Sequence, residues 1–250
     1  MNKTKRSDAQ QRAAIKRLEQ ELSIAAKILE WEIGDIWGHV GVRLPGDRGI
    51  AVQLFRRAEE GNKDWLVHFD CSLKKLSGVG TIPREAVIYT EIFKARPDVN
   101  AAVHCHASMC VALSIADKPV SCVHVQSGRF GTGVPIYPQP IYILDESEGA
   151  DLARTLGHAN GMMIKGHGIV TVGKTIDEAC LNAVYMERTA KIMAMAQLFG
   201  FSGVPKEFIG QLSSSKEKLL TRGRRLPHSA EWNYYADKIK KGEHWTRGWA

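Results

Sequence analysis

Two histidines that lie two positions apart are the first residues of this chain whose types and spacing could do chemistry. His104 and His106 lie in segment 101–107, and all the remaining residues of this segment are small or apolar. If this segment is a β-strand, alternate side chains point to the same face, so both imidazoles project from one side, roughly 7 Å apart at Cβ. That spacing would let two imidazoles hold one ion between them.

Two further residues extend this pair to a possible ligand set. His167 lies between two glycines, which allow a sharp turn that aims its side chain inward. Glu85 lies nineteen residues before His104. Three histidines and a carboxylate supply nitrogen and oxygen donors that suit a catalytic zinc or a similar divalent ion. A closed structural zinc site would more often use cysteines, and on a strand Cys105 would point away from the two histidines.

The helices and strands that must position these residues are predicted from the spacing of apolar residues and from the positions of glycine and proline. Apolar residues recur at helical spacing from residue 8 to about 32, and Gly34 ends this helix. Pro83 begins a helix over 85–95 with Glu85 in its first turn, where a glutamate could equally stabilise the helix dipole. We also expect a strand within 36–46, two or three strands within 50–76 with a polar turn at 59–63, strands at 100–107, 120–126, 162–165 and 169–172, a loop at 127–133, and helices at 108–116, 145–156 and 175–199.

Composition bounds the class of protein. Of the 250 residues, 44% are hydrophobic and 24% are charged, as in an ordinary soluble domain. No apolar run approaches the roughly 18 residues that cross a bilayer, and no apolar signal core follows the basic amino-terminus. The five cysteines contain no CxxC pair, which favours reduced thiols over a disulfide framework. We therefore expect a cytoplasmic protein with no membrane partner.

The net charge of +7 is concentrated near both ends, at 3–17 and 216–225. Nucleic acid is one possible partner, but no recognised nucleic-acid motif accompanies the charge, so we expect none. A potential that attracts an anionic substrate, or a plain solvated surface, explains the charge better. The tail at 213–250 becomes rich in tryptophan and tyrosine. Aromatic side chains must bury somewhere, either on their own core or on a neighbouring subunit, and we expect the neighbour.

Five motifs, in this order and at these spacings, resemble the class II aldolase and adducin family. They are Gly-His-Val-Gly-Val-Arg at 38–43, Pro-Arg-Glu at 83–85, Ala-Arg-Pro-Asp-Val at 95–99, His-Cys-His at 104–106 and Lys-Gly-His-Gly at 165–168. The resemblance covers residues 20 to 200. It implies one α/β domain over 1–250, with a central, mostly antiparallel β-sheet flanked by helices in three layers.

The resemblance also implies a site. It assigns one divalent metal ion per subunit, zinc in the first place and manganese, cobalt or iron otherwise, to His104, His106 and His167. It places Glu85 at the position of the catalytic acid/base, which can also contact the metal before substrate displaces it. Family members are commonly tetramers with sites between subunits, so the resemblance implies a homo-oligomer, a tetramer in the first place. Tyr235 of the tail, or the adjacent Tyr234, would then be available as an additional catalytic acid.

Two departures point away from the sugar-phosphate aldolases of this family. Those enzymes hold phosphate with a Gly-Asn turn and with Ser-Ser just before the glutamate, whereas this chain has His39 and Pro83-Arg84 at these places. The change resembles the branch that contains decarboxylases of hydroxylated aromatic or pyridine dicarboxylates. Arginine suits bidentate capture of a carboxylate, so we expect Arg84 and His39 to anchor the substrate, with Arg43 as a third substrate-binding residue.

The resulting hypothesis is a metal-dependent carbon–carbon lyase acting on a small anionic organic substrate, a decarboxylase before an aldolase. Aldol cleavage of a non-phosphorylated hydroxy-carbonyl compound would use the same residues and release an aldehyde instead of carbon dioxide. A non-catalytic, adducin-like interaction module would need no metal. An iron oxygenase could use the same ligands and would consume oxygen.

Overall fold

The computed structural model describes residues 2–46, 48–55, 66–201, 203, 205, 207–212 and 228–243. Within this part of the chain, eight strands form one sheet in the order β4-β3-β2-β1-β5-β8-β7-β6. Every neighbouring pair is antiparallel except β6 and β7. The strands are β1 (His39–Arg43), β2 (Ile50–Leu54), β3 (Leu66–Phe69), β4 (Lys75–Gly78), β5 (Ala101–Cys105), β6 (Ile136–Tyr137), β7 (Gly161–Ile164) and β8 (Gly168–Gly173).

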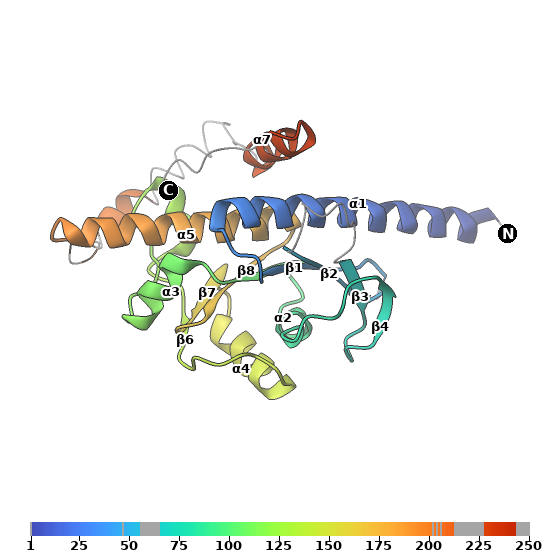
Figure 1. Ribbon diagram of the computed structural model, residues 1–250, viewed down its shortest axis with the longest axis horizontal. Coiled ribbons are helices and arrows are strands. Elements are labelled where there is room, and N and C mark those ends of the chain that lie inside the picture. The colour runs from blue at the N-terminus through green and yellow to red at the C-terminus, as the bar shows by residue number, and fades with distance from the viewer. Residues whose placement is uncertain are drawn as a thin grey trace.

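Helices cover both faces of this sheet. The long helices α1 and α5 lie along one face, and α2 and α4 lie beneath the other (Figure 1). The helices are α1 (Asn2–Ile33), α2 (Val87–Ala95), α3 (Ser108–Ile115), the 3-10 helix η1 (Val125–Phe130), α4 (Glu146–Leu156), α5 (Ile176–Leu198) and α7 (His228–Lys240). The expected α/β fold, with a mostly antiparallel sheet between helical layers, is confirmed. No helix in the described ranges has the length and apolar character that a bilayer crossing requires.

Strand alternation divides the core into two parts. On β5, Val103 and Cys105 point into the cluster that contains the buried faces of α1 and α5. Ala102 points the other way, into the cluster formed with α2 and α4. Because side chains alternate along a strand, His104 lies on the same face as Ala102. The central strand therefore delivers a histidine to the α2 side of the sheet.

Several assignments differ from the sequence expectations. Residues 120–124 are irregular and lead into η1 instead of forming a strand, because the Ser127 hydroxyl accepts hydrogen bonds from the N–H groups of Val123 and His124 and folds the segment back. Glu85 lies in the turn before α2 and not in the helix. The two-residue strand β6 was not expected. The turn expected at 59–63 lies outside the described residues.

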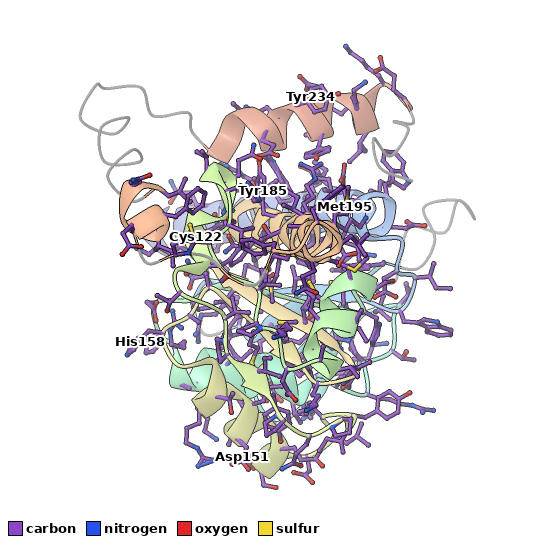
Figure 2. All side chains as sticks on the ribbon, turned by 90° about the vertical axis from the view of Figure 1, so that its left-hand side faces the viewer. Cys122, Asp151, His158, Tyr185, Met195 and Tyr234 are labelled. Carbon is purple, nitrogen blue, oxygen red and sulfur yellow. The ribbon has the colours of Figure 1, made fainter. Side chains whose placement is uncertain are left out.

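The described part of the tail packs on its own chain. Helix α7 rests on the outer side of α1 and α5 (Figure 1). Tyr185 of α5 lies beneath α7, whereas Tyr234 on α7 is more than half exposed (Figure 2). Residues 213–227 and 244–250 lie outside the described residues. Helix α7 buries Tyr235 within its own chain, and the expected docking of the tail at 213–250 on a neighbouring subunit stays a prediction.

Gly41 of β1 provides a test of how tightly α2 packs on the sheet. A Cβ atom built at this position would lie 2.5 Å from the ring of Tyr89. We expect Gly41→Ala to lower the free energy of unfolding by about 1–3 kcal/mol, because the fully buried Tyr89 has no room to move. Chemical denaturation would measure the loss. Gly128→Ala is the matched control, since no atom lies within 4 Å of the added methyl group. Equal stabilities of the two variants would contradict this account.

Candidate metal centre

Four side chains from three separate parts of the sequence converge at one end of β5. Glu85, His104, His106 and His167 each offer one ligand atom, and these atoms all lie within 4.8 Å of one another. The ring centroid of His104 lies 5.1 Å from that of His106 and 5.0 Å from that of His167. The structure thus brings together the four residues that the sequence suggested as metal ligands.

Local geometry explains why His167 reaches the other two histidines. It occupies the tight turn between β7 and β8, where Gly166 adopts a φ of +66° that disfavours any side chain. A Cβ atom at Gly168 would lie only 2.5 Å from the carbonyl oxygen of Cys105. The start of β8 therefore packs directly against the end of β5, and this close approach requires glycine. His167 consequently lies beside His104 and His106.

Each of the first two histidines has one ring nitrogen fixed by the protein. His104 is fully buried, and its Nδ1 lies 3.0 Å from the backbone carbonyl oxygen of Ile169. A carbonyl can only accept, so Nδ1 carries the proton and Nε2 keeps its lone pair for an ion. Nδ1 of His106 lies 3.0 Å from a carboxylate oxygen of Asp35. The Nε2 atoms of both rings are thereby left as the available ligand atoms.

The segment that follows His106 is also anchored. The buried carboxylate of Glu187, on α5, accepts hydrogen bonds from the backbone N–H groups of Met109 and Cys110 in the first turn of α3. A carboxylate there satisfies N–H groups that a helix leaves unpaired and is favoured by the helix dipole. The chain on both sides of His106 is therefore held in place.

Glu85 forms the fourth side of the cluster. One of its oxygens accepts a hydrogen bond of 2.8 Å from the backbone N–H of Ile143, and the other lies 3.3 Å from Nε2 of His104 and 3.6 Å from Nε2 of His167. Burial alone would raise the pKa of the Glu85 carboxyl. The neighbouring rings of His104 and His167 and the Ile143 N–H outweigh burial and hold that pKa well below its usual value.

The donor set fits a divalent cation. Nε2 of His104 and both ring nitrogens of His167 are buried and have no hydrogen-bond partner in the described part of the chain. A buried polar atom without a partner costs about 1–3 kcal/mol, and a bound cation would satisfy Nε2 of either ring. Burial lowers the pKa of His104, which favours the neutral form that coordinates a metal. Class II aldolases use a divalent metal, and the chemistry of these donors suits zinc, manganese, cobalt or iron without selecting one.

Two residues beside the cluster have exposed side chains that could meet a substrate. Arg84, which directly precedes Glu85, is exposed and makes no hydrogen bond or ion pair with any described residue. The ring of Tyr142 lies edge-on to His167, with 5.4 Å between centroids, and is 68% exposed. Tyr142 precedes Ile143, whose N–H binds Glu85, so its backbone is held close to the site. No sequence motif marks Tyr142 as a site residue.

The structure gives His39 a buried and neutral setting. It pairs with His104 across strands β1 and β5, and Nδ1 of His39 lies 2.7 Å from the hydroxyl of Tyr89. Burial, followed by the nearby His104, lowers the pKa of His39 to about 3. His39 therefore carries no positive charge near neutral pH, and we do not retain it as an anchor for a carboxylate.

Arg43 and Tyr235 lie away from the ligand cluster. The Arg43 guanidinium donates to the carbonyl oxygens of Phe93, in the last turn of α2, and of Arg96 and Val99 beyond it. Arg43 is four residues along β1 from His39, so the Cα atoms of the two residues are about 13 Å apart. Tyr235 hydrogen-bonds with Arg188 and Glu32 between α7, α5 and α1, on the other face of the sheet. These contacts are structural, so neither residue is kept in the proposed site.

Asp35 is the residue at this site that sequence reasoning missed most clearly. It follows the end of α1 and accepts hydrogen bonds from both the backbone N–H and the ring of His106. Burial would raise the pKa of its carboxyl, but the bonds from His106 and from the N–H of Trp37 outweigh burial and lower it to about 2. No local pattern marks Asp35, because its partner is 71 residues away.

A single substitution tests whether the cluster holds a metal. We expect His104→Ala to lose its bound divalent ion and to remain folded, because the ring supplies a ligand atom while the surrounding strands keep their pairing. Elemental analysis and circular dichroism would measure the two properties. His158→Ala is the control, since His158 is an exposed histidine (Figure 2). Metal retained at the level of the control would show that His104 is not a ligand.

Comparison with known proteins agrees with this geometry. The family model described as class II aldolase and adducin N-terminal domain matches residues 30–194. A 3,4-dihydroxyphthalate decarboxylase of Arthrobacter keyseri is 27% identical over 169 residues, covering 62% of this chain and 68% of that protein. An L-fuculose phosphate aldolase of Methanococcus vannielii is 28% identical over 142 residues, covering 55% and 74%.

Solved structures show the same fold. The crystal structure of an aldolase II superfamily protein from Pseudomonas syringae superposes with a TM-score of 0.76 at 22% identity, covering 90% of this chain and 93% of that one. The family match spans β1, the Glu85 turn, β5 and the β7–β8 turn, and so includes all four residues of the cluster. The chain belongs to the class II aldolase and adducin family.

Proposed function

We propose that this protein is a metal-dependent carbon–carbon lyase that decarboxylates a hydroxylated aromatic or pyridine dicarboxylate. The observation that carries the proposal is a partly buried cluster of three imidazoles and a carboxylate, in which Glu85 and His104 are buried and His106 and His167 are half-buried. Relatives of the chain include decarboxylases and aldolases, which supports a lyase. Members of the family act on small organic substrates and are often oligomeric, and we propose a homo-oligomer here.

His104, His106 and His167 would hold the ion, which when bound supplies Lewis-acid stabilisation of negative charge on a substrate oxygen. Glu85 would move the proton. Its carboxylate accepts the proton of a substrate hydroxyl next to the departing carboxylate and returns it to the ring carbon. The bond from that carbon to the carboxylate breaks, carbon dioxide leaves, and the electron pair of the broken bond returns to the ring system, which leaves a phenolate. A proton from solvent then restores the hydroxyl. The hydrogen bond from Ile143 fixes one oxygen of Glu85 and leaves the other facing the site.

An aromatic dicarboxylate suits the surroundings of the cluster. The guanidinium of Arg84 is exposed next to Glu85 and could bind a carboxylate through two parallel hydrogen bonds. The exposed ring of Tyr142 stands beside His167, where it could contact a planar substrate. The dihydroxyphthalate decarboxylases among the relatives act, by their names, on a substrate of this class.

Aldol cleavage is the second candidate, because an L-fuculose phosphate aldolase is among the relatives. It would use the same ion and glutamate but release an aldehyde. The resemblance associates phosphate binding with a Gly-Asn turn and a Ser-Ser pair before the glutamate. This chain has His39, which is buried, and Pro83-Arg84 at these places. An aldol substrate would therefore be non-phosphorylated.

Product analysis with Glu85→Gln tests the proposal. The metal-loaded wild-type protein should release carbon dioxide, and no aldehyde, from a hydroxylated aromatic dicarboxylate such as 3,4-dihydroxyphthalate under anaerobic conditions. Glu85→Gln should keep its metal and its fold, because the amide oxygen can still accept the bond from Ile143. It should lose roughly 10²- to 10⁴-fold in kcat, because the amide cannot carry the proton. Near-normal turnover by Glu85→Gln would refute the proton-transfer role. Release of an aldehyde from a non-phosphorylated hydroxy-carbonyl compound, with no carbon dioxide from the dicarboxylate, would favour the aldolase.

Arg84→Ala separates substrate binding from chemistry. Loss of a charged hydrogen-bond partner to a carboxylate should raise KM by roughly 10-fold or more while kcat changes little, since such bonds contribute about 1.5–3 kcal/mol. Steady-state kinetics would measure both constants. Lys174→Ala is the control, because Lys174 is an exposed cation beyond the far end of β8 from His167. An unchanged KM in Arg84→Ala would remove this arginine from the substrate site.

A further inference from the structure

We propose that Asp35 is a positioning residue that sets the orientation and the tautomer of His106 and thereby the affinity of the site for its ion. This inference rests on the metal site of the proposed function, but it does not depend on which substrate the site accepts. The carboxylate oxygens of Asp35 are not among the ligand atoms of the cluster. Asp35 acts only through His106.

The contacts of Asp35 use both oxygens of its carboxylate. One oxygen accepts from the backbone N–H of His106 at 2.8 Å and lies 3.0 Å from Nδ1 of the same residue. The other accepts from the backbone N–H of Trp37 at 2.9 Å. A carboxylate has only acceptor atoms, so the ring nitrogen that faces it must be the protonated one. Nε2 of His106 then keeps its lone pair and faces the cluster.

The three histidines differ in what fixes them. His104 is held by the backbone carbonyl of Ile169, which no substitution removes. Neither ring nitrogen of His167 has a hydrogen-bond partner in the described residues. Among these three rings, only that of His106 is hydrogen-bonded to a charged side chain from outside the ligand cluster. A carboxylate behind a coordinating imidazole also makes that imidazole a stronger donor to the ion.

The chain is built to hold Asp35 in this place. The side chain is almost fully buried, at 5% exposure. A Cβ atom at Gly38 would lie 2.9 Å from the Asp35 carboxylate and 2.2 Å from the ring of Phe55. Glycine at this position therefore lets the turn between α1 and β1 close tightly over the carboxylate. The arrangement joins the end of α1 to the end of β5 through one side chain.

Asp35→Asn is the informative substitution because it keeps the size of the side chain and changes what it can accept. Three N–H groups face the carboxylate, two from His106 and one from Trp37. The amide has one accepting oxygen, and its NH₂ group must face at least one of these donors. Asp98→Asn is the matched control, because Asp98 is also paired, with Arg96, but lies before the opposite end of β5.

Two measurements on the full chain test the proposal. Zinc titration of the metal-free proteins should give a Kd roughly 10- to 100-fold weaker for Asp35→Asn than for wild type, with Asp98→Asn unchanged. Ring-nitrogen NMR of the metal-free proteins, at a pH where His106 is neutral, should show Nδ1 protonated in wild type and a mixture of tautomers in Asp35→Asn. Thermal unfolding of the metal-free proteins should show that the variant remains folded.

Several results would overturn the proposal. A zinc Kd for Asp35→Asn equal to that of wild type would show that the carboxylate does not act on the ion site. Weaker zinc binding with the His106 tautomer unchanged would mean that Asp35 acts by another route. Loss of the metal-free fold would make its role structural. Neither measurement uses a substrate, so absence of decarboxylation would refute the proposed function without touching this result.

Discussion

The site depends on the cost of keeping imidazole nitrogens away from both water and hydrogen-bond partners. Nε2 of His104 and the ring nitrogens of His167 are in this state within the described structure. Proteins rarely leave such atoms unsatisfied, because each costs about 1–3 kcal/mol. The surrounding contacts maintain the arrangement, since Ile169 and Asp35 each fix one histidine. The metal-free site is therefore locally destabilised, and a bound cation would remove this cost by satisfying the ring nitrogens.

The position of the cluster could be predicted from the sequence because it follows from local rules. Strand alternation places His104 on a defined face, and the glycines around His167 indicate a tight turn. The supporting partners obey no local rule. Asp35 meets His106 across 71 residues, and Ile143 meets Glu85 across 58. These pairings join segments that only the tertiary fold brings together, so a single sequence does not reveal them.

Residue type alone also misled the assignment of substrate ligands. Arg43 looks like an anion anchor on an apolar strand, but its guanidinium satisfies carbonyl groups in the last turn of α2 and just beyond it. His39 shares a face with the cluster, but burial keeps it neutral. The segment 120–124 has the apolar character of a strand, but the Ser127 hydroxyl captures its N–H groups. In each case the tertiary surroundings, which residue type does not reveal, decided the outcome.

The pairing of β5 with both β1 and β8 has a consequence for the order of events during folding. His104 and His167 become neighbours only when β8 has closed against β5, and Asp35 reaches His106 only when the α1–β1 turn has arrived on the other side. Contacts between distant parts of a chain form slowly, because the closure of long loops must precede them. An ion would therefore meet all of its protein ligands only after the central strands have assembled. Metal binding during refolding would accordingly follow the pairing of β5 with β1 and β8.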